Sequence, residues 1–169
     1  MMGYLDAPNH ILANGSFTYQ WKASDKSKVE YWYVKSNDFY RLTLTTGRRE
    51  TFYKDLIPGV TFKNWADVNI SLFEYKIDTL FEYWFPDGKN AIAAGTYKMF
   101  NNTLNFTTPG GKNYGGSLTA TFGDFYGGKR IFISPDVHYN INKHFSIGLT
   151  YEYNHIAFDT YLDQFIYAL

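Results

Sequence analysis

The chain has 169 residues, and its 16 basic and 16 acidic side chains cancel to a formal net charge of zero, which argues against a nucleic-acid partner. It contains no cysteine, so disulfides, thiolate catalysis and cysteine-ligated zinc are excluded. Aromatic residues make up 21% of the chain, which excludes disorder, and no run approaches the ~20 apolar residues of a membrane-spanning helix.

The two ends of the chain predict a fragment. Residues 1–14 show no clear β pattern, and the first eight have neither the basic nor the apolar region of a secretory signal peptide. Residues 165–169 stop in the middle of an alternating pattern. We therefore expect residues 1–169 to form a single β domain that belongs to a longer protein.

Period-two alternation of apolar and polar side chains predicts strands along most of the chain. In residues 28–35, Val29, Tyr31 and Tyr33 occupy the predicted apolar face and Trp32 the polar face. In residues 145–154 every second residue is apolar, and the intervening ones are Ser, Gly, Thr, Glu and Asn. Further strands are expected over residues 16–22, 39–46, 60–72, 75–85, 97–106, 117–125 and 129–139, with a last strand starting near His155.

Clusters of Gly, Pro, Asn, Asp and Ser separate these strands and predict short hairpin links. Residues 64–67 are a candidate turn inside the segment 60–72. Links are expected at residues 24–27, 36–38, 46–49, 86–90, 109–113 and 140–144. No helical segment is convincing, so about ten strands joined by short links predict an all-β, antiparallel up-and-down meander.

The chemistry of the strand faces favours a transmembrane β-barrel, or part of one, over a soluble β-sandwich. Sandwich cores are filled with Val, Ile and Leu, whereas the apolar faces here often end in Tyr or Trp near a turn, as at a lipid–water interface. The alternative is a Tyr-rich sandwich that binds a soluble ligand through exposed aromatics. The expected membrane-interface aromatics are Trp21, Tyr33, Tyr83, Trp84, Tyr126, Tyr139, Tyr151 and Tyr153.

Polar and ionisable residues on the opposite faces predict a wet lumen. Two carboxylates about 5–9 Å apart would suit a glycosidase pair. We favour the ordinary alternative, a ladder in which carboxylates pair with Lys and Arg across strands. The expected lumen charges are Glu30, Arg41, Asp78, Asp124 and Glu152.

The sequence predicts no catalytic, metal or cofactor site. The four histidines are scattered, without a spacing that brings two imidazoles onto one element. The paired glycines are followed by no helix, so they indicate turns and strand bends rather than a phosphate loop. No Ser/His/Asp arrangement stands out.

From about Asp78 onward the order of motifs resembles that of a known family. The segments that carry the resemblance are residues 80–86 (LFEYWFP), 91–97 (AIAAGTY), 107–109 (TTP), 121–128 (TFGDFYGG) and 151–156 (YEYNHI). They are similar to the C-terminal outer-membrane β-barrel region of an uncharacterised family of Gram-negative proteins. The family has an N-terminal carbohydrate-binding, family-nine-like domain and is often labelled as membrane-associated hydrolases. Residues before Asp78 match only loosely.

The resemblance implies a location in the outer membrane of a Gram-negative bacterium, with the lipid bilayer as partner and glycans bound only through the absent N-terminal domain. The strands that would close the barrel are absent too, and any hydrolase activity is expected elsewhere in the parent protein. The expected function is a membrane anchor that also forms a small pore. The alternatives are a glycan-binding or glycan-hydrolysing module, using aromatics such as Trp65 and Trp84, and a soluble β-sheet structural module.

Overall fold

The computed structural model describes residues 10–43, 49–80, 83–84, 91–109, 113–142, 144–158 and 161–167. Within these ranges the chain forms strands and turns. The described residues include no helix with the length and apolar character needed to cross a membrane. The first strand begins at His10, inside the stretch for which the sequence predicted no pattern.

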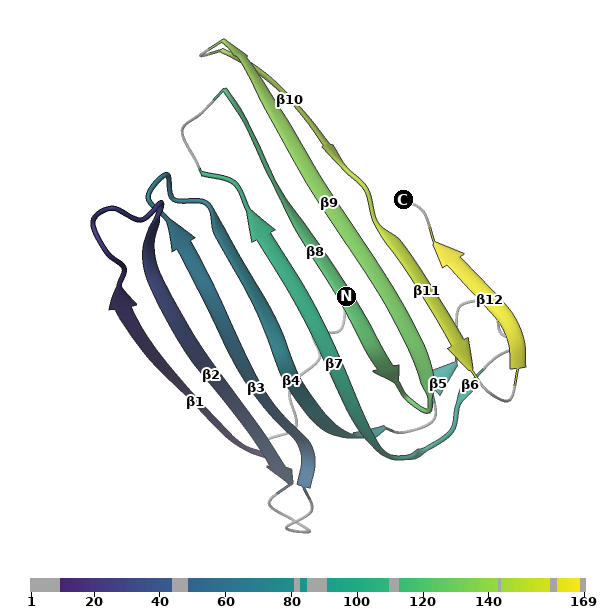
Figure 1. Ribbon diagram of the computed structural model, residues 1–169. Coiled ribbons are helices and arrows are strands. Elements are labelled where there is room, and N and C mark those ends of the chain that lie inside the picture. Colours follow the sequence, from purple (N-terminus) through teal and green to yellow (C-terminus); the bar gives the residue numbers. More distant parts are fainter. Residues whose placement is uncertain are drawn as a thin grey trace.

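Ten strands form one antiparallel sheet, in which the strands lie side by side in the order in which they follow one another along the chain, except for β10 (Figure 1). The predicted all-β antiparallel meander is therefore confirmed. Strands β10 and β11 both pair with β9, and β5 and β6 form a separate small hairpin. The strands are β1 (His10–Lys22), β2 (Val29–Thr43), β3 (Arg49–Phe62), β4 (Asp67–Leu80), β5 (Tyr83–Trp84), β6 (Ala91–Ile92), β7 (Gly95–Thr107), β8 (Tyr114–Phe125), β9 (Gly128–Asn142), β10 (Phe145–Thr150), β11 (Tyr153–Phe158) and β12 (Tyr161–Tyr167).

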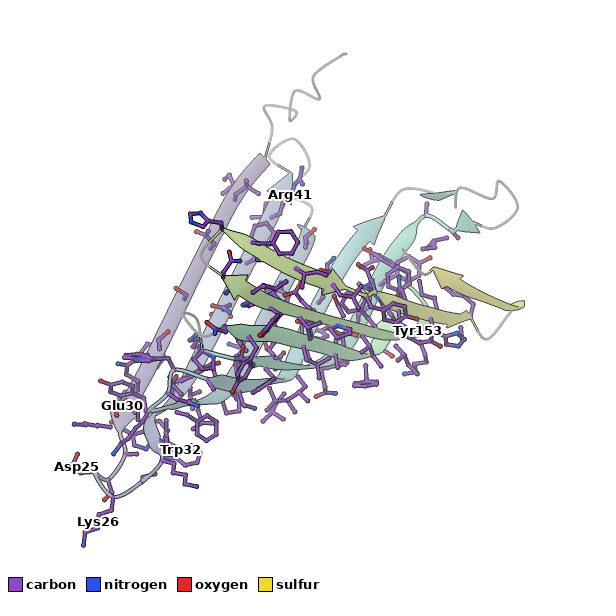
Figure 2. All side chains as sticks on the ribbon, turned by 90° about the horizontal axis from the view of Figure 1, so that it is seen from above. Asp25, Lys26, Glu30, Trp32, Arg41 and Tyr153 are labelled. Carbon is purple, nitrogen blue, oxygen red and sulfur yellow. The ribbon has the colours of Figure 1, made fainter. Side chains whose placement is uncertain are left out.

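The sheet is twisted and staggered, with β1 and β12 at its two edges. Seen from above, the strands around β1 run at a steep angle to those around β9 (Figure 2). The row of paired residues that begins at Lys22, the last residue of β1, passes through Asp67 and reaches Asp136. Asp136 lies six residues before the end of β9. The strand ends on this side of the sheet are therefore displaced along the strand direction from β1 to β9. Tilted strands with this stagger are the geometry from which barrels are built.

The predicted links and the predicted turn differ in how they compare with the structure. Residues 36–38 were expected to form a link but lie inside β2, where Asn37 pairs with Ser16 of β1 and with Asp55 of β3. This prediction is wrong because neighbours on both sides satisfy the backbone of a polar segment as well as that of an apolar one. The candidate turn at 64–67 is confirmed, since β3 ends at Phe62 and β4 begins at Asp67. The link at 86–90 lies outside the described residues.

Residues 145–158 form one ladder along β9, with a break at residues 151–152. The Tyr151 N–H donates to the Pro135 carbonyl (3.0 Å), but proline has no N–H with which to return a bond to Tyr151. The pairing on both sides of the break keeps the same register, and β10 and β11 run in line in Figure 1. A strand does begin near His155, as predicted, since β11 starts at Tyr153, but it continues the ladder of β10 and is followed by β12, which is the last strand.

Candidate functional site: an apolar face and a polar face

One side of the sheet, the apolar face, exposes large hydrophobic side chains. Among the described residues, every exposed large hydrophobic side chain except those of Leu12 and Trp65 lies on this face. Leu149 is 68% exposed and Phe17 63%. One row of paired residues on this face crosses seven strands: Trp21, Trp32, Val60, Val68, Phe106, Leu118 and Pro135. Tyr151, whose N–H donates to the Pro135 carbonyl, continues the row. An antiparallel sheet in water normally buries such a face.

The other side, the polar face, carries a network of hydrogen bonds between side chains of β2, β4, β7 and β8. The Tyr33 hydroxyl and the Asn69 amide both donate to Asp67, at 2.7 and 2.9 Å. The Asn105 amide donates to the Asn69 side-chain oxygen (3.0 Å), and the Thr119 hydroxyl donates to the Asn105 oxygen (3.0 Å). Because paired residues share a face, the register sets this ladder directly.

A buried carboxylate lies within the polar face. Asp55 is 3% exposed and accepts hydrogen bonds from the Tyr53 hydroxyl (2.9 Å) and the Ser71 hydroxyl. Hydroxyl donors to both of its oxygens compensate the loss of water around the carboxylate. Sequence alternation alone did not single out Asp55.

A β-bulge in β4 brings Glu74 to the same face. The pairing of β4 with β7 shifts by one residue between Ser71 and Glu74, so both side chains lie on the polar face. The sequence does contain a signal for this bulge, because the apolar positions of β4 change from even at Leu72 to odd at Tyr75. Glu74 was missed because it fell between the predicted strands at residues 60–72 and 75–85, which the structure joins through the bulge into one strand.

A hollow of about 290 Å³ next to Glu74 combines charged and aromatic side chains. The Arg130 guanidinium lies 4.8 Å from the centre of the Phe132 ring, and its Nε donates to the Asn154 side-chain oxygen (2.9 Å). Carboxylate and guanidinium in one wall fit a charge ladder. The hollow is lined by Glu74, Lys76, Met99, Asn101, Thr121, Asp124, Phe125, Tyr126, Arg130 and Phe132.

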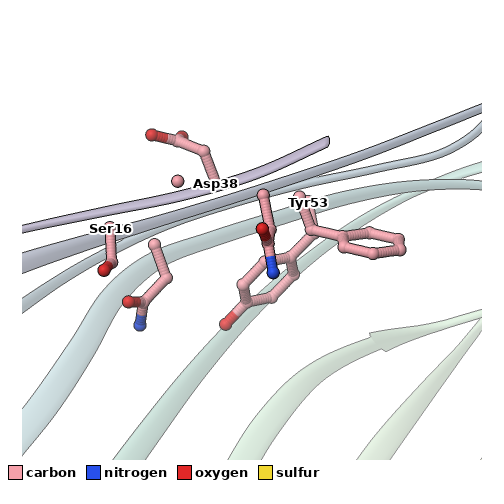
Figure 3. Close-up of a pocket in the computed structure, with 7 residues that line it drawn as sticks. Ser16, Asp38 and Tyr53 are labelled. Carbon is pink, nitrogen blue, oxygen red and sulfur yellow. The ribbon is translucent and has the colours of Figure 1, made fainter. Parts of the chain in front are cut away.

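A second hollow, of about 350 Å³, lies along the polar face of β1, β2 and β3. In Figure 3 the side chains of Ser16 and Tyr53 point to one side of the strands and that of Asp38 to the other. Asp38 forms an ion pair with Lys54 on the apolar face (3.7 Å). The lining residues are Asn14, Gly15, Ser16, Asn37, Asp38, Phe39 and Tyr53.

Two of the expected lumen charges lie on the polar face. Arg41 is placed there by its pairing with Leu12 and Thr51. Glu152 lies between β10 and β11, and alternation along the chain puts it on the same face as Thr150 and Asn154, the polar face. The backbone of Asp78 falls in the row of Arg41, although the Asp78 side chain lies outside the described part.

The other two expected lumen charges lie at strand ends. Glu30 falls within a register shift at the start of β2. Asp124, near the end of β8, accepts a hydrogen bond from the Phe100 N–H (2.9 Å) and pairs with Lys129 (2.5 Å). The five charges are therefore spread over the sheet rather than gathered in one site.

Most of the expected interface aromatics that the structure describes lie on the apolar face. Trp21, Tyr139 and Tyr151 are exposed there, and Tyr153 is half-buried against His155, with stacked rings. Tyr126 lies in the turn between β8 and β9. The side chains of Tyr83 and Trp84 lie outside the described residues.

Tyr33 is a correction to the predicted face of β2. It is 5% exposed on the polar face, while Trp32 is on the apolar face opposite Trp21. Aromatic residues occupy both parities of residues 31–33, so alternation within this strand alone was ambiguous. The pairing with Trp21, which only the hairpin register defines, decides the orientation.

Within the described ranges there is no group of three His, Cys, Asp or Glu residues that could hold a metal ion. Comparison of the chain with family models, with curated proteins and with solved structures gives no match.

Proposed function

We propose that this chain forms part of the wall of an outer-membrane β-barrel and anchors a larger surface protein of a Gram-negative bacterium in the lipid bilayer. The observation that carries the proposal is the distribution of side chains over the two faces. Hydrophobic side chains are exposed, whereas polar side chains are hydrogen-bonded and partly sheltered. A soluble protein buries its hydrophobic side chains and exposes its polar ones. A membrane barrel reverses this, because its outer surface meets lipid and its interior holds water.

The dimensions of the apolar face support a bilayer partner. On β9 the apolar positions run from Ile131 to Ile141, about 33 Å along the strand at ~3.3 Å per residue. A strand tilted by about 40° then covers about 25 Å of membrane thickness, which is the height of the apolar band of outer-membrane barrels. The stagger of the hairpin ends fits the same tilt.

The polar face would line the barrel interior, as wall of a small pore. Its ladder from Tyr33 to Thr119 joins neighbouring strands through side chains as well as backbone. The resemblance of the segment beyond Asp78 to an outer-membrane barrel region supports the bacterial outer membrane as the location.

Folding in detergent tests the proposal. The chain is expected to show a β signal by circular dichroism only with detergent micelles or lipid vesicles, and to migrate faster on a gel when it is not boiled. A chain that is folded and monomeric in plain buffer would contradict the proposal. Screening for glycan binding, with Trp65→Ala and Trp84→Ala, would then follow.

Cysteine labelling tests which face meets lipid, because the natural chain contains no cysteine. In vesicles, Cys at Leu104 or Phe106 should react with a lipid-embedded maleimide and resist a water-soluble one. Cys at Thr103 or Asn105 should show the opposite preference, since these neighbours lie on the polar face. Equal labelling of all four positions by the soluble reagent would contradict a lipid-facing sheet.

A further inference from the structure

Three of the four tryptophans lie at one end of the sheet together with four lysines. Trp21 and Trp32 face each other across β1 and β2 on the apolar face, and Trp65 lies in the turn between β3 and β4. Figure 2 shows Asp25, Lys26 and Trp32 at this end of the molecule. We call the following residues the Trp–Lys tip: Trp21, Lys22, Lys26, Lys28, Trp32, Lys63 and Trp65.

The two turns of the Trp–Lys tip form one surface. The Lys63 N–H donates to the Lys28 carbonyl (2.9 Å), and the Lys63 Nζ donates to the Asp25 carbonyl (2.5 Å). These bonds hold the β3–β4 turn against the β1–β2 turn. An ammonium group has three donors, so Lys63 keeps donors for a ligand.

Positive charge predominates on this surface. All four lysines are exposed, and the carboxylates beside them in the chain are Asp25 and Glu30. Lys22 pairs with Asp25 (3.5 Å). In the part of the chain that the structure describes, Lys26 and Lys28 have no carboxylate within ion-pair distance. Their charge is available to an anion.

Trp65 adds an independent observation, because it is strained and exposed. Its φ is +67°, in the left-handed region that bulky residues avoid, and its side chain is 69% exposed. Its N–H donates to the Phe62 carbonyl (2.8 Å), which closes the turn. Backbone strain that presents an indole ring to the surroundings points to a function for that ring.

We propose that the Trp–Lys tip binds the phosphate headgroups of anionic phospholipids at one surface of the bilayer. Lysine ammonium groups are attracted to anionic headgroups, and indole rings favour the depth at which headgroups meet acyl chains. This inference rests on the proposed function, since the tip reaches headgroups only if the apolar face meets acyl chains.

Quenching by brominated lipids tests the inference. A Trp84→Phe background confines the emission to the three tryptophans of the tip. The protein is inserted into phosphatidylcholine vesicles that contain brominated phosphatidylglycerol or, in the reference, brominated phosphatidylcholine. Each Lys near an anionic surface contributes about a fivefold factor in association. At low salt we expect phosphatidylglycerol to be preferred at least about fivefold.

The matched variants remove two charges each. Lys26→Gln with Lys28→Gln should bring the preference close to one, whereas Lys98→Gln with Lys129→Gln, outside the tip, should leave it unchanged. No preference in the parent protein, or the same preference in both variants, would overturn the inference. So would loss of the preference in inorganic phosphate but not in chloride of equal ionic strength, because the tip would then be a site for free phosphate. Emission quenched by neither lipid would overturn the proposed function itself.

Discussion

At Gly59 the absence of a side chain makes room for Tyr33. A Cβ added to Gly59 would collide with the Tyr33 ring, whose hydroxyl donates to Asp67. Gly59→Ala is expected to lower the free energy of unfolding by about 1–3 kcal/mol through overpacking. Urea titration of the protein in micelles measures this value. The control is Gly15→Ala, because a Cβ there meets no atom within 4 Å; an equal loss in both variants would contradict the packing argument.

Trp65 allows backbone strain to be separated from the contribution of its ring. Trp65→Ala and Trp65→Gly both remove the ring, but only glycine adopts φ of +67° without a Cβ penalty. We expect the glycine variant to be more stable to urea than the alanine variant by about 1 kcal/mol. If the two variants unfold at the same urea concentration, the turn is not strained.

At the scale of the strand, Pro135 explains why the residues that pair with β9 form two strands, β10 and β11, rather than one. Pro135→Val supplies an N–H that can donate to the Tyr151 carbonyl, so β10 and β11 should merge into one strand. We expect a gain of about 0.5–1.5 kcal/mol in the free energy of unfolding, the usual net value of one hydrogen bond. Hydrogen exchange should also slow at the amides of residues 151–153. Unchanged exchange there would show that something other than proline interrupts the ladder.

Strands could be predicted from the sequence where only the odd-numbered or only the even-numbered positions are apolar. Residues 117–125 and 129–139 fall within β8 and β9, because their alternation has only one consistent orientation. Alternation failed where both parities are aromatic, as at Trp32 and Tyr33, and where the bulge before Glu74 shifts the pattern by one residue. In both cases the orientation depends on a partner strand, which local sequence does not encode.

At the scale of the whole molecule, the proposed membrane role predicts opposite responses to charge on the two faces. Leu104 and Thr103 are neighbours on β7 that lie on opposite faces of the sheet. Leu104→Lys is expected to cost up to about 2–4 kcal/mol, the more the closer the residue lies to the bilayer midplane, whereas Thr103→Lys should cost less than about 1 kcal/mol. The yield of heat-modifiable protein after folding into vesicles measures the difference. Equal yields for the two variants would argue against a lipid-facing sheet.

The sequence alone determined the fold class and those strands in which only one parity is apolar, such as residues 117–125 and 129–139, because alternation and turn residues act over a few neighbouring positions. It also excluded disulfides and thiolate chemistry, since these follow from composition. Only the tertiary structure decided which residues meet: the pairing of Trp21 with Trp32, the shelter of Asp55 by Tyr53 and Ser71, and the joining of two turns into the Trp–Lys tip. These contacts depend on strand register and stagger, which are set by pairing across the whole sheet rather than by any single segment.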